Sequence, residues 1–151
     1  MPLAVLLLVN ALVVGTFRVV GDSMRATLEP GDFLIVSKVA ASAASVSGWL
    51  GVPAVPAERG DVVVFQLPRN PSLVLVKRVI GIPGDRVEIR EGVDDIVPEG
   101  AVFVVGDNRE PGVSSDSRDW GYLPCRQIIG TAVMRLLPIR RAGLLAVERN
   151  P

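Results

Sequence analysis

The chain has 151 residues with 16 acidic and 16 basic side chains, so its length suits one domain and its charge offers nothing to attract nucleic acid. It contains no histidine, which excludes Ser-His-Asp and Cys-His catalysis and histidine-based metal sites, and its one cysteine excludes an internal disulfide. With 15 glycines and 12 prolines, the composition favours a β-rich fold with many turns. Any side-chain base is therefore a carboxylate or one of two lysines, Lys38 and Lys77.

Residues 1–17 carry no charged side chain and are mostly Leu, Val and Ala. A helix of some 15–17 residues spans roughly 22–26 Å, which is shorter than the ~30 Å hydrocarbon core of a bilayer. The segment can be a short membrane anchor, the apolar core of a cleaved signal peptide, or a buried N-terminal element. It has no basic side chain ahead of the apolar run and only a poor cleavage site. We therefore predict an anchor helix over residues 1–16.

Short runs of branched apolar residues predict β-strands in the rest of the chain. These runs cover residues 33–38, 62–66, 72–82, 87–90, 101–105 and 128–137. Turn residues separate the runs and no long amphipathic helix is indicated, so we predict an all-β barrel or sandwich. This β domain is expected over residues 17–151, with residues 142–151 as a tail of one or two helical turns.

Three segments between the predicted strands are expected to be loops. Residues 39–58 are apolar and nearly uncharged, with Trp49 at their middle, so they either tuck into the core or lie on a membrane surface. Residues 94–100 form a shorter loop. Residues 106–121 are polar and turn-forming, and a loop of this length with so much hydrogen-bonding capacity is either disordered or functional.

Two adjacent cations, Lys77 and Arg78, lie inside the apolar strand predicted over residues 72–82. Their side chains point to opposite faces of the strand, and both faces are apolar. Such a lysine most often carries its charge to water along its stem. If it is buried, desolvation lowers its pKa, whereas an arginine keeps its charge. The residues alone leave two states of Lys77 open, a cation that reaches water and a buried neutral amine, and we expect Arg78 to pair with a carboxylate that the sequence does not identify.

Four groups of residues, in this order and spacing, resemble the sequence boxes of bacterial type I signal peptidases. The groups are Ser23-Met24 with Thr27-Leu28 and Gly31-Asp32, then Arg59 to Val63, then Lys77 to Asp85, and finally Gly106 to Arg109 with Ser114 to Arg118 and Trp120-Gly121. The resemblance covers residues 17–135 and is to the short form of the family, which lacks a large inserted domain.

The resemblance implies a fold, an activity and a location. The fold is an open β-barrel or sandwich of short, mostly antiparallel strands with an N-terminal membrane-anchor helix. The activity is that of a serine endopeptidase that cleaves signal peptides from exported preproteins after small-x-small motifs. The enzyme would cross the bacterial plasma membrane once, with its catalytic domain on the extracytoplasmic face. Its partners would be signal peptides and the lipid bilayer, and no cofactor, metal or nucleic acid is expected.

The resemblance also implies roles for particular residues. Ser23 matches the nucleophile and supplies the oxyanion donor through its backbone N–H, and Lys77 matches the general base. Ser114 matches the residue that orients the lysine amine. Ser115 is the alternative, because the spacing that follows Arg109 is longer than the family pattern. A supporting ion pair is matched by Asp116 and Arg118, and the apolar substrate pockets are matched by Phe17, Val19, Met24, Leu28, Leu34 and Val76.

Several residues compete with these assignments or depart from the family pattern. Lys38 is the other lysine, but it ends a predicted strand beside a loop. Asp22 is another candidate base, but in an extended segment it points away from the side on which Ser23 lies. Ala26 stands where the family box has proline, and we expect a looser turn there. Gly21 stands where some relatives carry a hydroxyl that assists the oxyanion.

Two other functions remain open from the sequence. A self-cleaving repressor-type Ser-Lys protease shares the catalytic logic, but it should carry an internal Ala-Gly or similar cleavage site and a partner domain, and neither is visible. An inactive, membrane-tethered β module could bind peptides without cleaving them. The presence of both Ser23 and Lys77 favours the enzyme over this module.

Overall fold

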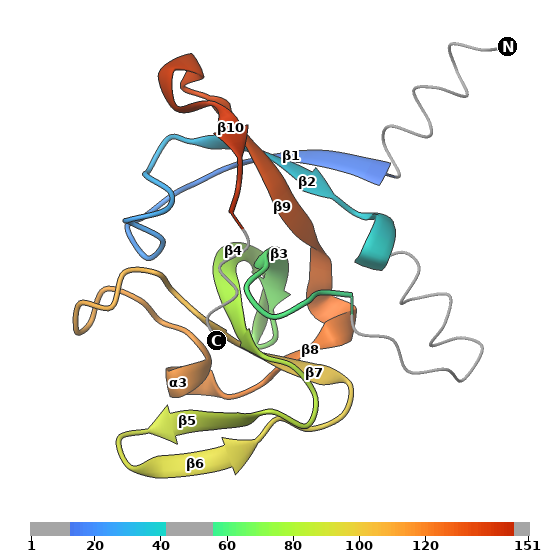
Figure 1. Cartoon of the computed structure of the whole chain (residues 1–151), viewed down its shortest axis with the longest axis vertical. Coiled ribbons are helices and arrows are strands. Elements are labelled where there is room, and N and C mark those ends of the chain that lie inside the picture. Colours follow the sequence, from blue (N-terminus) through green and yellow to red (C-terminus); the bar gives the residue numbers. More distant parts are fainter. Residues whose placement is uncertain (1–12, 42–55, 147–151) are drawn as a thin grey trace, which may run out of the picture.

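The computed structural model describes residues 13–41 and 56–146 of the chain, and these form mostly antiparallel β-sheet (Figure 1). The strands are β1 (Val14–Arg18), β2 (Phe33–Ser37), β3 (Val62–Leu67), β4 (Asn70–Gly81), β5 (Arg86–Arg90), β6 (Val93–Ile96), β7 (Ala101–Val105), β8 (Leu123–Pro124), β9 (Ile128–Leu137) and β10 (Gly143–Leu144). Short helical segments are α3 (Ser117–Trp120), η1 (Cys125–Gln127) and η2 (Ile139–Arg141). The prediction of an all-β, mostly antiparallel fold is confirmed.

The larger sheet has the strand order β1-β2-β9-β3-β4-β7-β8, with β10 beside β9. The hairpin of β5 and β6 forms a separate two-stranded sheet at the lower end of the molecule in Figure 1. Within the described residues the end strands β1 and β8 do not pair with each other, so the path of the sheet is open and does not close into a barrel. This order places β4, the strand of Lys77 and Arg78, between β3 and β7.

The start of the chain differs from the predicted anchor helix. Residues 14–16, which we assigned to the anchor, belong to β1, and residues 1–12 lie outside the described residues. The strand forms because Val14–Arg18 pairs along its whole length with β2, with Gly15 and Phe17 turned inward and the other side chains exposed. In residues 13–41 and 56–146, no helix is long and apolar enough to cross a bilayer.

Three further segments differ from their predictions. The first residues of the loop expected over residues 94–100 belong to β6. All side chains of this strand are exposed, so its sequence does not need the alternation of apolar and polar residues that predicts a half-buried strand. The polar loop over residues 106–121 contains the helical turn α3. The tail expected to be helical from residue 142 instead adds β10 to the edge of β9. Most of the apolar loop over residues 39–58 lies outside the described residues.

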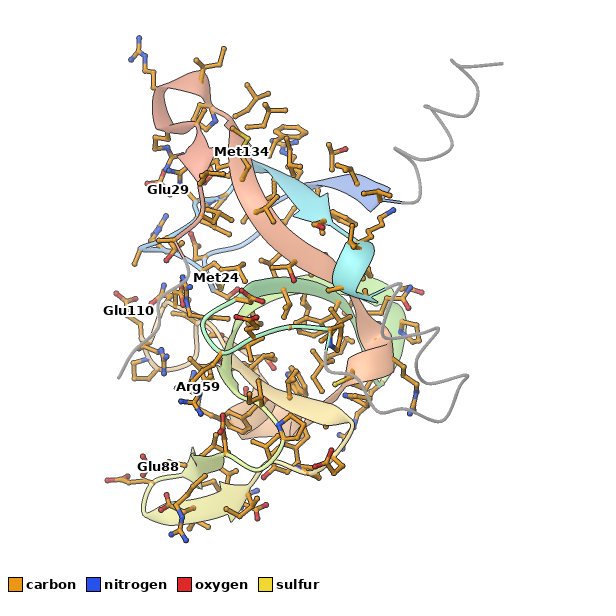
Figure 2. The ribbon with its side chains drawn as sticks, turned by 45° about the vertical axis from the view of Figure 1, so that its right-hand side comes forward. Met24, Glu29, Arg59, Glu88, Glu110 and Met134 are labelled. Carbon is orange, nitrogen blue, oxygen red and sulfur yellow. The ribbon has the colours of Figure 1, made fainter. Side chains whose placement is uncertain are left out.

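Among the described residues the core comprises three hydrophobic clusters, and the first one anchors the segment that carries Ser23. In this cluster Met24 and Leu28 pack with Val36 of β2 and with Val62 and Val64 of β3. Figure 2 shows Met24 pointing into the body of the molecule. A turn between β1 and β2 is therefore held by its own buried side chains.

Candidate active site

Ser23 lies in a tight turn between β1 and β2. The turn is closed by three backbone hydrogen bonds. One runs from Arg25 N to Asp22 O at 3.0 Å, and Met24 O accepts the other two, from Thr27 N at 3.1 Å and from Leu28 N at 2.8 Å. Met24 and Leu28 are 1% and 0% exposed, so their burial fixes the turn against the sheet. The serine side chain, which is only partly buried, is presented from this fixed turn.

Lys77 reaches Ser23 from β4, which is 54 residues further along the chain. The lysine is 2% exposed and stands opposite Val63 of β3 in the sheet register. Its Nζ donates a hydrogen bond to Ser23 Oγ at 2.6 Å. This separation lies within the ~2.6–3.2 Å that proton transfer between the two groups requires. The other lysine, Lys38, packs its side chain close to Gly15 of β1.

The surroundings of Lys77 favour its neutral form. Burial lowers the pKa of this amine below its usual 10.5, and the carboxylates of Asp116 and Asp107 oppose the shift without cancelling it. A neutral amine has a lone pair that can accept the proton of the serine hydroxyl. The two carboxylates would then stabilise the ammonium ion that forms.

Asp116 is the centre of a buried polar cluster at the start of α3. Its carboxylate accepts two hydrogen bonds from the Arg118 guanidinium group, at 2.8 Å each, and one from Arg118 N at 3.3 Å. It also accepts one from Ser114 Oγ at 2.7 Å and one from Gly106 N at 3.0 Å. Burial by itself raises the pKa of Asp116, but these hydrogen bonds outweigh it and hold the pKa below its usual value. The ion pair expected between Asp116 and Arg118 is present.

Ser114 lies beside the Ser23 turn, although its hydroxyl donates to Asp116 rather than to the lysine. A Cβ atom added at Gly106 would collide with the Ser114 side chain and the Ser23 carbonyl, so both groups pack directly against this glycine. Ser115, the alternative to Ser114, is exposed. The geometry therefore brings Ser114 into the site through Asp116, while a contact with Lys77 remains a prediction.

The partner of Arg78 is Asp107, which sequence reasoning did not identify. The guanidinium group donates to Asp107 Oδ1 from Nε at 2.8 Å and to Oδ2 from Nη2 at 2.6 Å. It also donates to Gly60 O at 2.8 Å, and Thr27 Oγ1 donates to Asp107 Oδ2 at 2.6 Å. The pair therefore ties the Ser23 turn to β4. The signal available in the sequence was the place of Asp107 in the Gly106 to Arg109 box.

A cavity of about 120 Å³ opens beside the Ser23–Lys77 contact. Four of the six predicted pocket residues line it, namely Phe17, Val19, Met24 and Val76. The other two, Leu28 and Leu34, are fully buried in the core beneath the turn and do not line this cavity. Their apolar character, which matched the pocket pattern, is explained by core packing.

Ala26 has a backbone φ of +103°, which a residue with a side chain rarely adopts. Proline fixes φ near −65°, so the proline of the family box cannot take the conformation that this turn has. We expect Ala26→Pro to destabilise the fold by about 1–3 kcal/mol and Ala26→Gly to leave it unchanged or more stable. Thermal unfolding of both variants checks this, and an unchanged melting temperature for Ala26→Pro would contradict it.

The sequence matches the family model described as signal peptidase, peptidase S26, over residues 1–96 and 90–137. It is 34% identical over 178 residues to a probable signal peptidase I of Synechocystis sp., covering 95% of this chain and 84% of that protein. It is 35% identical over 153 residues to a signal peptidase I of Leptolyngbya laminosa, covering 82% and 69%. A mitochondrial ATP-independent inner membrane protease subunit of Arabidopsis thaliana is 32% identical over 141 residues, covering 88% and 76%.

Proposed function

The chain belongs to the signal peptidase family, peptidase S26, and we propose that it is a membrane-bound serine endopeptidase that removes signal peptides from exported preproteins. The observation that carries the proposal is the 2.6 Å contact between Ser23 Oγ and Lys77 Nζ in a buried site. A hydroxyl beside a desolvated amine is the minimum required for a Ser-Lys protease in a chain without histidine.

The reaction would proceed through an acyl-enzyme. Ser23 Oγ attacks the carbonyl carbon of the scissile peptide while its proton passes to Lys77 Nζ. The oxygen of the tetrahedral intermediate accepts a hydrogen bond from the Ser23 backbone N–H. The Lys77 ammonium then protonates the departing amine, and the neutral lysine activates a water molecule that releases the acyl group.

Substrate selection follows from the small cavity beside the dyad. A volume of about 120 Å³ accepts a small side chain, and the walls formed by Phe17 and Met24 would clash with a large one. The strand β1 is at the end of the sheet order, so an extended peptide can pair with its outer edge. We propose that the segments before the cleavage site bind here with small residues in the cavity.

The proposed location is the bacterial plasma membrane, with a single pass and the catalytic domain on the extracytoplasmic face. Residues 1–12 carry no charged side chain and are mostly apolar in sequence, which suits the anchor that we predict. The mitochondrial relative is by name an inner membrane protease. An anchored enzyme would meet a precursor whose signal peptide is held in the same bilayer.

The proposal predicts that the purified protein cuts a model precursor with alanine at positions −3 and −1, counted from the cleavage site. Phenylalanine at −1 should prevent the cut because the cavity cannot hold it. Ser23→Ala should reduce the rate by about 10³-fold or more, since it removes the nucleophile. Ser37→Ala, a substitution in β2 away from the cavity, is the matched control and should keep the normal rate.

Product masses from gel and mass spectrometry locate the cut. A precursor cleaved equally well with alanine or phenylalanine at −1 would contradict the proposed pocket. Cleavage that survives Ser23→Ala would exclude Ser23 as the nucleophile. A protein that binds the precursor without cutting it would instead be the peptide-binding module.

A further inference from the structure

The peptide bond between Asp22 and Ser23 has hydrogen-bond partners on one side only. Its carbonyl oxygen accepts a hydrogen bond from Arg25 N at 3.0 Å and another from Asn108 Nδ2 at 3.1 Å. Its N–H, which belongs to Ser23, donates to no group in the described part of the chain. Since a trans peptide is planar, with its C=O and N–H pointing in opposite directions, fixing the carbonyl also fixes the N–H.

Asn108 is itself held in one orientation. Its backbone N–H donates to Ser23 O at 2.9 Å, and its side-chain Oδ1 accepts a hydrogen bond from Glu110 N at 3.1 Å. This second bond directs the Nδ2 end of the amide toward Asp22 O. Asn108 therefore contacts the carbonyl groups on both sides of the Ser23 Cα, one through its backbone and one through its side chain.

The two hydrogen-bond donors to the Asp22 carbonyl come from different parts of the fold, and only one of them can fix the Ser23 peptide relative to the rest of the site. Arg25 belongs to the same tight turn and moves with it. Asn108 lies 86 residues away in sequence, in the segment that follows β7. In the sheet register, Val105 of β7 stands opposite Arg78 of β4, next to Lys77. The bond from Asn108 is thus the one that relates the Ser23 peptide to the strand that carries the proposed base.

We propose that Asn108 is a positioning residue whose side-chain amide orients and polarises the Ser23 peptide as the oxyanion donor. A peptide whose carbonyl accepts hydrogen bonds has a more positive N–H, because chains of hydrogen bonds polarise one another. The N–H then stabilises the negative charge that develops on the scissile carbonyl oxygen. This role rests on the proposed function, because an oxyanion forms only if Ser23 is acylated.

The test uses Asn108→Ala and Asn108→Asp in the full chain, because both keep the backbone bond to Ser23 O and remove the side-chain donor. We expect kcat to fall by about ten- to a hundredfold and KM to change by less than about twofold. The fall in kcat should not exceed the ~10²–10³-fold loss that follows when an oxyanion donor itself is removed. For Asn108→Ala, the acid side of the pH–rate profile should not move, because Lys77 is unaffected. The control is Glu110→Ala, whose exposed side chain lies on the same loop (Figure 2) and which should keep the normal kcat.

Two inhibitors separate positioning of the donor from general damage to the site. A peptide aldehyde forms a hemiacetal with Ser23, and its oxygen occupies the oxyanion position, so its affinity should fall by the same factor as kcat. A peptide of the same sequence with proline after the cleavage site is bound without being cut, and its affinity should stay unchanged.

Normal kcat in either Asn108 variant would overturn the proposal, and so would an equal loss of affinity for both inhibitors. Failure of both variants to fold would overturn it as well, since the role assigned to Asn108 is to position one peptide on a scaffold that is stable without it. An inactive wild-type protein would remove the proposed function and this role together. An active wild type with an equally active Asn108→Ala variant would remove only the positioning role.

Discussion

Lys77→Arg is expected to reduce signal-peptide cleavage by about 10³-fold or more, while leaving the fold intact. Arginine keeps its proton at any pH at which the protein is folded, so it cannot accept the proton of Ser23. The lysine can, because burial lowers the pKa of its amine. Cleavage assays on one model precursor measure the loss, and Lys38→Arg, which changes the other lysine, is the matched control and should keep its activity.

The same mechanism fixes the shape of the pH–rate profile. Below the lowered pKa of Lys77 the amine is protonated and the enzyme is inactive, so the rate should rise with pH through that pKa and then level off. The rise should lie below the usual lysine value of 10.5. Substantial activity in Lys77→Arg, or a rate that stays flat well below neutral pH, would indicate a carboxylate base instead.

The lowered pKa of Lys77 also predicts an effect on stability. Between that pKa and 10.5 the unfolded chain keeps a proton that the folded amine has lost, so the free energy of unfolding rises with pH across this window. Lys77→Met removes the buried amine and with it this part of the pH dependence. We expect the inactive Lys77→Met variant to melt a few degrees higher than the wild type at neutral pH.

Asp107→Ala is expected to destabilise the protein by about 3–5 kcal/mol, because it leaves the guanidinium group of Arg78 buried without its carboxylate. The side chains of Arg78 and Asp107 are 3% and 9% exposed. Replacing both, as Arg78→Met with Asp107→Leu, should recover much of the loss, since no charge then remains buried. Urea denaturation of Arg78→Met, Asp107→Leu and the double variant measures the coupling between the two positions.

The matched control for this pair is the surface ion pair between Arg86 and Asp94 of the β5–β6 hairpin. These side chains are 73% and 50% exposed and their charged atoms are 3.6 Å apart. Removing Arg86 should change the free energy of unfolding by no more than about 1 kcal/mol. If Asp107→Ala costs no more than this exposed pair, the buried pair does not hold the Ser23 turn in place.

The segment from Gly106 to Arg118 connects the parts of the proposed site. Asp107 pairs with Arg78 on β4, Asn108 contacts the Ser23 turn, and Asp116 lies close enough to Lys77 to influence its pKa. The side chains of this polar loop that contact the site have specific hydrogen-bond partners, which hold the loop against the Ser23 turn and β4. This one short segment therefore both holds the Ser23 turn in place and supplies the carboxylates that act on the pKa of Lys77.

Sequence reasoning was least accurate where the same apolar residues suit two structural roles, such as a pocket wall and the core, or a membrane anchor and a β-strand. Leu28 and Leu34 matched a pocket pattern but are core residues, because an apolar side chain looks the same in a pocket wall and in a core. Residues 14–16 looked like the end of an anchor but pair with β2, and pairing depends on a partner strand far along the chain. The exposed strand β6 has no apolar alternation and left no signal.

By itself, the sequence determined the all-β class and limited a side-chain base to a carboxylate or one of two lysines, because strand periodicity and the absence of histidine are local or compositional properties. The roles of Ser23 and Lys77 were implied by the resemblance of their sequence boxes to those of signal peptidases. Only the tertiary structure decided that Lys77 Nζ lies 2.6 Å from Ser23 Oγ, that Arg78 pairs with Asp107, and that Asn108 contacts the Ser23 turn. These contacts join residues 29–86 positions apart. Their geometry depends on strand register and on the burial of the turn, which no local pattern specifies.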